Sequence, residues 1–152
     1  MSVGNFIKTM KPRKNSKYHQ GYISPESCKK YYSSCKDAPI IYRSGLEYQF
    51  IEYCENSPMI VKWASEVLAI PYYSKLDGKQ QNYYPDYVIE NNKGVRCIVE
   101  VKPANQTVKP DATDSQFLKE AWIKNVDKWT AAKKYAEDHD MKFIIVTENF
   151  FK

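Results

Sequence analysis

Residues 83–102 have the sequence YYPDYVIENNKGVRCIVEVK, and this stretch decides the fold of the chain. Both of its ends are rich in Tyr, Val and Ile, which favour β-strands, and the NNKG segment between them is typical of a turn. We therefore predict a β-hairpin. Because residues two apart in a strand share a face, Glu100 and Lys102 are expected on one face, while Val99 and Val101 point into the core.

The predicted hairpin gathers charged side chains at one edge of the sheet. If its turn centres on Lys93, Asp86 lies opposite Glu100. Two carboxylates and the Lys102 ammonium then converge on a small area, which stabilises no fold unless a divalent cation binds there. Mg²⁺ prefers oxygen ligands, commonly one or two carboxylates together with water and substrate phosphate. The hairpin therefore indicates a metal site.

Each of these residues also has a structural interpretation. Asp86 follows a proline and can simply mark the entry to a strand, because Asp is disfavoured within strands. Glu100 and Lys102 can form an exposed strand face on which the two charges pair. Against this, Ile98 shares the face of Glu100, which predicts burial on both sides of the strand. A buried carboxylate needs a partner, and a cation supplies one.

Helical and extended patterns alternate in the rest of the chain. Ser44 is expected to cap a helix that ends near Glu55, and an apolar stripe predicts a long helix over residues 114–138. The stripe consists of Leu118, Trp122, Val126, Trp129 and Ala132 or Ala136. The remaining predicted segments are two strands over 60–64 and 68–73, a turn at 77–78, a loop over 103–113 and a buried strand over 142–147. This is an α/β fold, a mixed β-sheet flanked by helices in the order α-β-β-β-α-β.

Glu47 has two interpretations. It lies three residues after Ser44, and Ser-x-x-Glu is the pattern of a capping box, in which the glutamate bonds the backbone N–H of the cap residue itself. The presence of Asp86, Glu100 and Lys102 elsewhere in the chain favours a metal-binding role instead. The sequence leaves both open.

The combination of Pro85-Asp86 with Glu100-Val101-Lys102 resembles the signature of the PD-(D/E)XK nuclease superfamily. An upstream Arg43-Ser44-x-x-Glu47 helix start makes the chain most similar to the endonuclease subunit of heteromeric transposases and to the head-completion nucleases of contractile-tailed phages. The resemblance covers residues 42–148 and implies a restriction-endonuclease-like core.

The resemblance also implies roles for individual residues. Asp86, Glu100, the main-chain carbonyl of Val101 and Glu47 would hold Mg²⁺, for which Mn²⁺ would substitute. Lys102 would position and activate the attacking water or neutralise the nonbridging oxygens. The implied reaction is hydrolysis of a DNA phosphodiester bond, whose transition state accumulates negative charge.

Positive charge is concentrated at the start of the chain. Residues 1–36 hold eight Lys or Arg and one acid, a net charge of +7, whereas residues 37–152 hold 15 basic and 17 acidic residues, a net charge of −2. We predict a basic N-terminal arm over 1–36 and a nuclease-like domain over 37–152. Such an arm binds phosphate backbones without reading sequence, and the alternative is a solvated tail. The basic residues expected to bind DNA are Lys11, Arg13, Lys14 and Lys17.

A second set of candidate DNA-binding residues lies within the domain. Arg43 and Ser44 stand at the start of the first helix, and Lys124, Asn125 and Lys128 recur along the second. Their structural alternatives are a helix start without a partner and a solvated helix face. No base-reading motif is apparent, so DNA structure or a protein partner is expected to select the substrate.

Length and composition are typical of one soluble domain. The chain has 152 residues, 43% of them hydrophobic and 27% charged, and it contains no apolar run long enough to cross a membrane. The N-terminus lacks the apolar segment of a signal peptide. Its four cysteines form no C-x-x-C pair, which predicts free thiols in a reducing cytoplasm, here that of a host cell.

Three functions remain open at this stage. The first is a Mg²⁺-dependent DNA endonuclease that acts in phage head completion after DNA packaging, with DNA and phage portal or neck proteins as partners and an association with the virion. The second is a structural DNA-binding or capsid-closing protein that keeps a nuclease fold. The third is a transposase endonuclease subunit. Retention of Glu47, Asp86, Glu100 and Lys102 favours an active enzyme.

Overall fold

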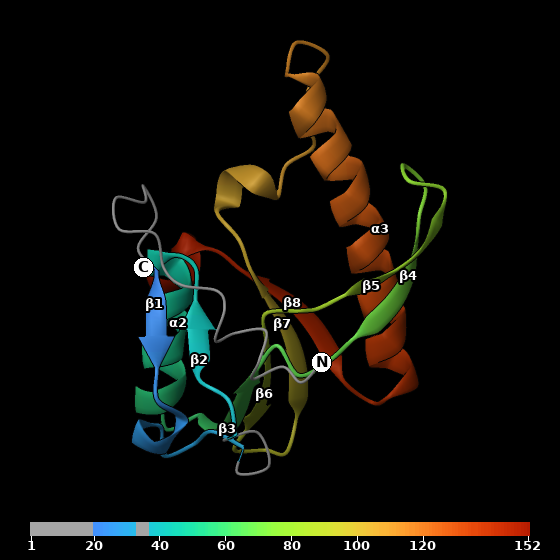
Figure 1. The fold of residues 1–152 in the computed structure, drawn as a ribbon. Coiled ribbons are helices and arrows are strands. Elements are labelled where there is room, and N and C mark those ends of the chain that lie inside the picture. Colours follow the sequence, from blue (N-terminus) through green and yellow to red (C-terminus); the bar gives the residue numbers. More distant parts are fainter. Residues whose placement is uncertain (1–19, 33–36) are drawn as a thin grey trace.

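The computed structural model describes residues 20–32 and 37–152, and its centre is a four-stranded mixed sheet in the order β3-β6-β7-β8 (Figure 1). Neighbouring strands are antiparallel from β3 to β7, whereas β7 and β8 are parallel. The strands span Ile60–Ser65 (β3), Tyr87–Asn91 (β6), Arg96–Val101 (β7) and Lys142–Val146 (β8). This mixed sheet confirms the predicted α/β class.

The predicted hairpin is β6 and β7. Tyr87 pairs with Val99 and Glu90 with Arg96, so the pairing is centred on Lys93, and its continuation sets Asp86 opposite Glu100. The turn is stabilised locally, because the Asn91 side chain accepts hydrogen bonds from two turn amides. The register on which the sequence argument depends is therefore confirmed.

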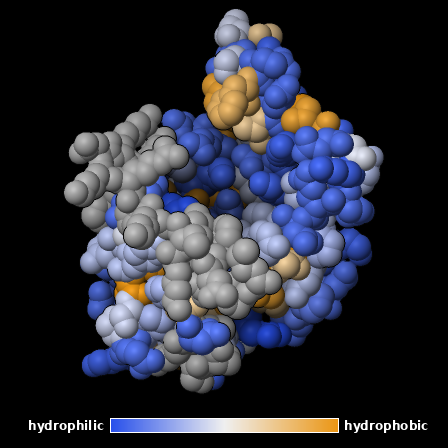
Figure 2. All heavy atoms as spheres, in the orientation of Figure 1, coloured by the Kyte–Doolittle hydropathy of each residue, from blue (hydrophilic) through white to orange (hydrophobic). Residues whose placement is uncertain are grey.

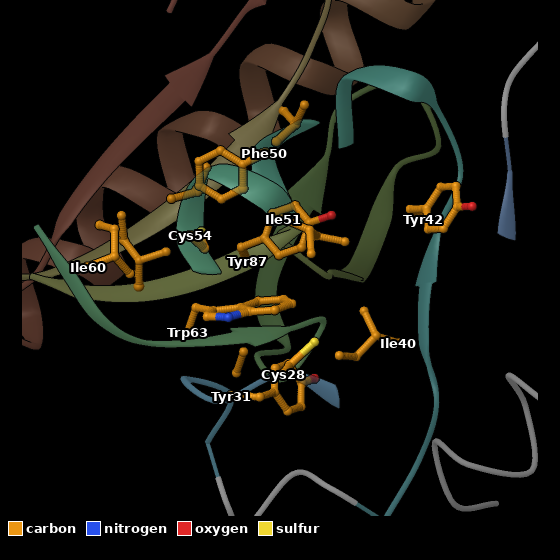
Figure 3. Packing of buried hydrophobic residues seen from close by; sticks show 14 of the residues in the cluster. Cys28, Tyr31, Ile40, Tyr42, Phe50, Ile51, Cys54, Ile60, Trp63 and Tyr87 are labelled. Carbon is orange, nitrogen blue, oxygen red and sulfur yellow. The ribbon is translucent and has the colours of Figure 1, made fainter. Parts of the chain in front are cut away.

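Helices α2 (Gly45–Asn56) and α3 (Gln116–Asp138) belong to two different hydrophobic clusters. The cluster of α2 includes Val99 and Val101, and Figure 3 shows it packed around Trp63. The cluster of α3 includes Ile98, the neighbour of Val99 in β7. Successive residues of β7 thus enter opposite clusters, which confirms that this strand is buried on both faces.

Strands β4 (Ile70–Ser74) and β5 (Lys79–Tyr83) form a separate two-stranded sheet that packs on α3. The sequence analysis predicted a strand near β4 but none at β5. The sequence of β5, KQQNY, is polar and has only Tyr83 as a residue that favours strands, so it depends on its pairing with β4. This hairpin ends at Tyr83, three residues before Asp86.

Part of the predicted arm belongs to the folded domain. Strand β1 (Gly21–Ile23) pairs with β2 (Ile40–Tyr42), and the 3₁₀-helix η1 (Pro25–Ser27) follows β1. Tyr31 is buried against Trp63, with the ring centroids 4.7 Å apart. The predicted boundary between residues 36 and 37 thus assigns residues 21–32 to the arm, although they pack in the folded domain. The charge count did not take account of the apolar side chains among the lysines. Lys11, Arg13, Lys14 and Lys17 lie outside the described residues.

The apolar stripe of α3 is buried only in its C-terminal half. Trp129, Ala132 and Ala136 are buried, but Leu118 and Val126 are 46% and 37% exposed. These two side chains are exposed because the first turns of α3 project beyond the sheet (Figure 1), and Figure 2 shows hydrophobic surface on the projecting part.

Two further predictions concern the cysteines and the membrane. Cys28, Cys54 and Cys97 are free thiols, and Cys35 lies outside the described residues. Within 20–32 and 37–152, no helix combines the length and the apolar character needed to span a bilayer.

Candidate active site

Asp86 is fixed at the start of β6 by its backbone and its side chain. Its Oδ2 accepts a hydrogen bond from the Val101 N–H at 2.7 Å, and its carbonyl accepts one from the Glu66 N–H at 3.0 Å. The first bond joins the end of β7 to the residue that precedes β6. Asp86 is therefore held where the two strands of the hairpin separate.

Glu100 is a buried carboxylate, 8% exposed, with a donor on each oxygen. Its Oε2 accepts a short hydrogen bond from the Tyr83 hydroxyl, and its Oε1 lies 3.4 Å from the Lys102 Nζ. Glu100 and Lys102 thus lie close together, as predicted, but Glu100 is buried and only Lys102, with a side chain 20% exposed, reaches solvent. The sequence analysis assigned Tyr83 no role, and the available signal was its position just before Asp86.

Glu47 caps α2 in a modified form of the predicted box. The Ser44 hydroxyl accepts from the Glu47 N–H at 3.1 Å, as in a capping box. The Glu47 Oε2, however, accepts from the backbone N–H of Arg43 at 3.0 Å, one residue before the cap, rather than from that of Ser44. The capping interpretation is therefore confirmed with a different partner, and the metal-binding interpretation stays a prediction.

The charges around Asp86 are unbalanced. Burial raises the pKa of Asp86 well above its usual range, and the negative charges of Glu100 and Glu47 raise it further, against the Val101 N–H and Lys102. Burial likewise raises the pKa of Glu47, opposed mainly by Arg43. Removing such groups from water is unfavourable unless a cation accompanies them.

Arg43 is held by an acidic partner. Its guanidinium forms an ion pair with Glu66, to which the sequence analysis assigned no role. Glu66 adopts a left-handed conformation with a φ of 53°, which is uncommon outside glycine, and its N–H bonds Asp86. The Arg43 side chain is 33% exposed, so one part of it faces solvent near Glu47 and Asp86.

The two candidate lysines of α3 differ in their surroundings. Lys124 Nζ lies 3.1 Å from Asp77 Oδ2 and is paired there. Lys128 Nζ lies 5.9 Å from the centre of the Tyr83 ring, and its pKa is lowered by burial and by Lys102 and Lys124, against the attraction of Glu100 and Asp86. Of these two lysines, Lys128 is therefore the one whose pKa is influenced by the carboxylates of Glu100 and Asp86.

A cavity of about 780 Å³ adjoins the site between the loop after β7 and the first half of α3. Its lining includes Lys102, Gln106, Lys109, Phe117, Trp122 and Asn125. Lys102 therefore contacts Glu100 and also lines a solvent-accessible space, as a group that acts on a substrate must.

The carboxylates of the site could hold a divalent cation. Among the described residues, no three Asp, Glu, His or Cys side chains are grouped closely enough to surround an ion. Mg²⁺ usually keeps several waters and takes one or two carboxylates. Asp86 and Glu100 supply two such carboxylates, and their mutual repulsion would be relieved by a divalent cation.

The sequence is similar to those of known nucleases. The family model of the TnsA-like endonuclease N-terminal domain matches residues 57–148, which include Asp86, Glu100 and Lys102 but not Glu47. The chain belongs to this family. It is also 35% identical over 140 residues to the head completion nuclease of Enterobacteria phage T4, a match that covers 86% of this chain and 92% of that protein.

The membership confirms the resemblance inferred from the Pro-Asp and Glu-x-Lys motifs, and with it the restriction-endonuclease-like fold. The family is one of endonucleases, so a nuclease site at the end of the β6–β7 hairpin agrees with its chemistry.

Proposed function

We propose that this protein is a Mg²⁺-dependent DNA endonuclease that hydrolyses phosphodiester bonds during phage head completion, after DNA packaging. The observation that carries the proposal is the convergence of Asp86, Glu100 and Lys102 where β6 and β7 separate. The carboxylates of Asp86 and Glu100 repel each other there. The similarity to a protein named head completion nuclease supports the biological setting.

The residues of the chain divide the chemistry between them. Asp86, Glu100 and the Val101 carbonyl would hold the cation, which when bound offsets negative charge in the transition state and acidifies a coordinated water. Lys102 would orient and activate the attacking water or neutralise a nonbridging phosphate oxygen. Its contact with Glu100 Oε1, at 3.4 Å, holds its ammonium beside the proposed cation ligands.

Glu47 would add a carboxylate from α2. We propose that it binds a water of the first cation or contributes to a second cation site. This role is compatible with its cap, because a carboxylate accepts about four hydrogen bonds and the Glu47 side chain has two donors, the Arg43 N–H and the Ser44 hydroxyl.

DNA would be bound by two surfaces. One is the basic arm with Lys11, Arg13, Lys14 and Lys17, which would contact phosphates without reading sequence. The other lies on the domain around Arg43, Ser44, Lys124, Asn125 and Lys128. Phage portal or neck proteins are the partners that would bring DNA ends to these surfaces, and the protein would act in the host cell or in association with the virion.

The test is cleavage of supercoiled plasmid with Mg²⁺ or Mn²⁺ and with EDTA. We expect cation-dependent nicking by the wild type and none by Asp86→Ala, Glu100→Ala or Lys102→Ala, each still folded by circular dichroism. Lys93→Ala is the matched control, because Lys93 is an exposed lysine in the turn of the same hairpin.

Three outcomes would contradict the proposal. Wild-type protein that binds DNA without cleaving it under either cation would favour the structural, capsid-closing function. Cleavage by Lys102→Ala at the rate of Lys93→Ala would remove the assignment of the site. Cleavage confined to transposon ends in the presence of a second protein would indicate the transposase function instead.

A further inference from the structure

Tyr83 joins a separate hairpin to the proposed active site. It is the last residue of β5, it is only 4% exposed, and its hydroxyl donates a hydrogen bond to Glu100 Oε2. We propose that Tyr83 is a positioning residue that holds the Glu100 carboxylate in the orientation in which it binds the divalent cation. This inference rests on the proposed function.

The hydroxyl and the Lys102 ammonium fix Glu100 together. A glutamate side chain has several rotatable bonds, and one donor would leave its carboxylate free to turn about that contact. Here Tyr83 binds Oε2 and Lys102 approaches Oε1, so both ends of the carboxylate are defined. Each carboxylate oxygen has a second lone pair, so acceptor capacity remains for a cation.

The choice of a neutral donor matters for this role. A second lysine or an arginine on Oε2 would compete with the cation through its own positive charge. A hydroxyl orients the carboxylate without neutralising it, so the negative charge that attracts the cation is kept. Tyr83 therefore supplies geometry, while Lys102 supplies charge at the other oxygen.

Tyr83 is itself held firmly. It pairs with Ile70 across the β4–β5 hairpin and lies in the hydrophobic cluster that includes Ile98 and Trp129. Lys128 of α3 stands over its ring. The position of its hydroxyl is thus set by the packing of the β4–β5 hairpin on α3, outside the β6–β7 hairpin that carries Asp86 and Glu100.

The segment between Tyr83 and Asp86 makes these two groups one unit. Only Tyr84 and Pro85 separate them, and Tyr84 is 57% exposed. Asp86 therefore supplies one carboxylate of the site, and Tyr83, three positions earlier in the chain, orients the other, that of Glu100.

The test compares Tyr83→Phe with the wild type. Phenylalanine keeps the buried ring and removes only the hydroxyl. Losing a group that orients a metal ligand commonly weakens metal affinity or activity by about 10–100-fold. We expect Mn²⁺ affinity, measured by calorimetry on the full chain without DNA, to fall in that range. The Mg²⁺ concentration for half-maximal cleavage should rise in parallel, while DNA affinity in EDTA stays unchanged.

Tyr72→Phe is the matched control. Tyr72 is also buried in the β4–β5 hairpin, and its hydroxyl donates to Gln81 Oε1 at 2.8 Å, away from the carboxylates of the site. Both variants keep the ring and lose one tyrosine hydrogen bond, which is buried at Tyr83 and partly buried at Tyr72, so Tyr72→Phe measures what the loss of a hydroxyl in this hairpin does to the melting temperature. Only Tyr83→Phe should lose Mn²⁺ affinity.

Three results would overturn the inference. If Tyr83→Phe keeps the Mn²⁺ affinity and Mg²⁺ dependence of an active wild type, the positioning role is wrong while the proposed function stands. If Tyr72→Phe loses as much affinity as Tyr83→Phe, the effect belongs to the stability of the hairpin. If the wild type neither binds Mn²⁺ nor cleaves DNA, the proposed metal site and the inference fail together.

Discussion

Two groups of side chains flank Asp86, and they hold their carboxylates differently. On the α2 side, the Arg43 guanidinium forms an ion pair with Glu66, and the Arg43 backbone N–H donates a hydrogen bond to Glu47 Oε2. On the β7 side, Glu100 is held by the neutral Tyr83 hydroxyl and by a longer contact to Lys102. The first group pairs a carboxylate with a guanidinium, and the second orients a carboxylate with a neutral hydroxyl and a lysine.

This difference leads us to expect that the proposed cation is bound by Glu100 and Asp86 rather than by Glu66. Glu66 already has a guanidinium partner, and a close ion pair binds a further cation weakly. Glu100 and Asp86 raise each other's energy by repulsion, which a shared cation would relieve. We therefore expect the α2 side to serve mainly as structural support, with Glu47 at its edge, and the β7 side to take part in the proposed reaction.

The largest effects are expected when each of the three glutamates around Asp86 is replaced by glutamine. In the series Glu100→Gln, Glu47→Gln and Glu66→Gln, each substitution removes one charge and keeps the shape. We expect Glu100→Gln to slow cleavage on the order of 10²–10³-fold, Glu47→Gln by about 10–100-fold, and Glu66→Gln to cleave near the wild-type rate. The rates come from plasmid nicking at saturating Mg²⁺.

Stability should follow a different order from activity. Glu66→Gln leaves Arg43 without its ion pair and should lower the free energy of unfolding by about 1 kcal/mol, a modest value because Arg43 is partly exposed. Glu47→Gln keeps an acceptor for the Arg43 N–H and should be nearly neutral. Full activity in Glu47→Gln would show that Glu47 is only a cap, and loss of activity in Glu66→Gln would break the comparison.

The sequence predicted the elements whose structure is decided locally. The β6–β7 hairpin and its register followed from strand-forming residues around an Asn- and Gly-containing turn, and the start of α2 followed from Ser44. From that register the approach of Asp86 and Glu100 was predictable. The partner of the Glu47 carboxylate was not, because it depends on the path of the chain before the cap.

Elements that depend on distant parts of the chain could not be predicted in this way. Strand β5 is polar and forms by pairing with β4, so its own sequence carries little strand signal. Periodicity identified the apolar face of α3 but could not show that its first turns extend beyond the sheet. For the same reason the sequence indicates only a strand residue at Tyr83, since the packing of the β4–β5 hairpin is what brings its hydroxyl to Glu100.

The N-terminal arm provides a second test, of smaller effect on catalysis. We expect the groups around Asp86 to carry out cleavage and the arm to take no part in it. Deleting residues 1–17 removes Lys8, Lys11, Arg13, Lys14 and Lys17 and no acid. If these side chains bind phosphates, the slope of log affinity against log salt should flatten by up to about 0.9 for each phosphate that the truncated chain no longer neutralises, while Mg²⁺ dependence persists.

The measurement is titration of duplex DNA at several salt concentrations, in EDTA so that cleavage does not interfere. Residues 20–32 stay in the truncated chain, because Cys28 and Tyr31 belong to the core. An unchanged slope would mean that the arm does not bind phosphates. The DNA-binding surface would then have to be formed by the domain, around Arg43, Lys124 and Lys128.

The smallest expected effect is on stability as a function of pH without a cation. Burial and the charges of Glu100 and Glu47 raise the pKa of Asp86, so the folded protein binds this proton more tightly than the unfolded chain, where an Asp has a pKa of about 3.9. The stability that Asp86 contributes is present below that value and is lost as the pH rises through the raised, folded-state pKa. Each tenfold difference in proton affinity between the two states is worth about 1.4 kcal/mol.

Asp86→Asn should abolish this loss, because the amide oxygen can still accept from the Val101 N–H and carries no charge. In EDTA, denaturation at a series of pH values should show Asp86→Asn gaining stability over the wild type as the pH rises. Asp77→Asn is the control of opposite sign, since Lys124 lowers the pKa of Asp77, and this variant should lose stability relative to the wild type at neutral pH. Mg²⁺ should restore the wild type at high pH and leave Asp86→Asn unchanged, because the cation relieves a repulsion that the variant lacks. Parallel pH dependence in the wild type and Asp86→Asn would mean that Asp86 carries no excess charge for a cation to balance.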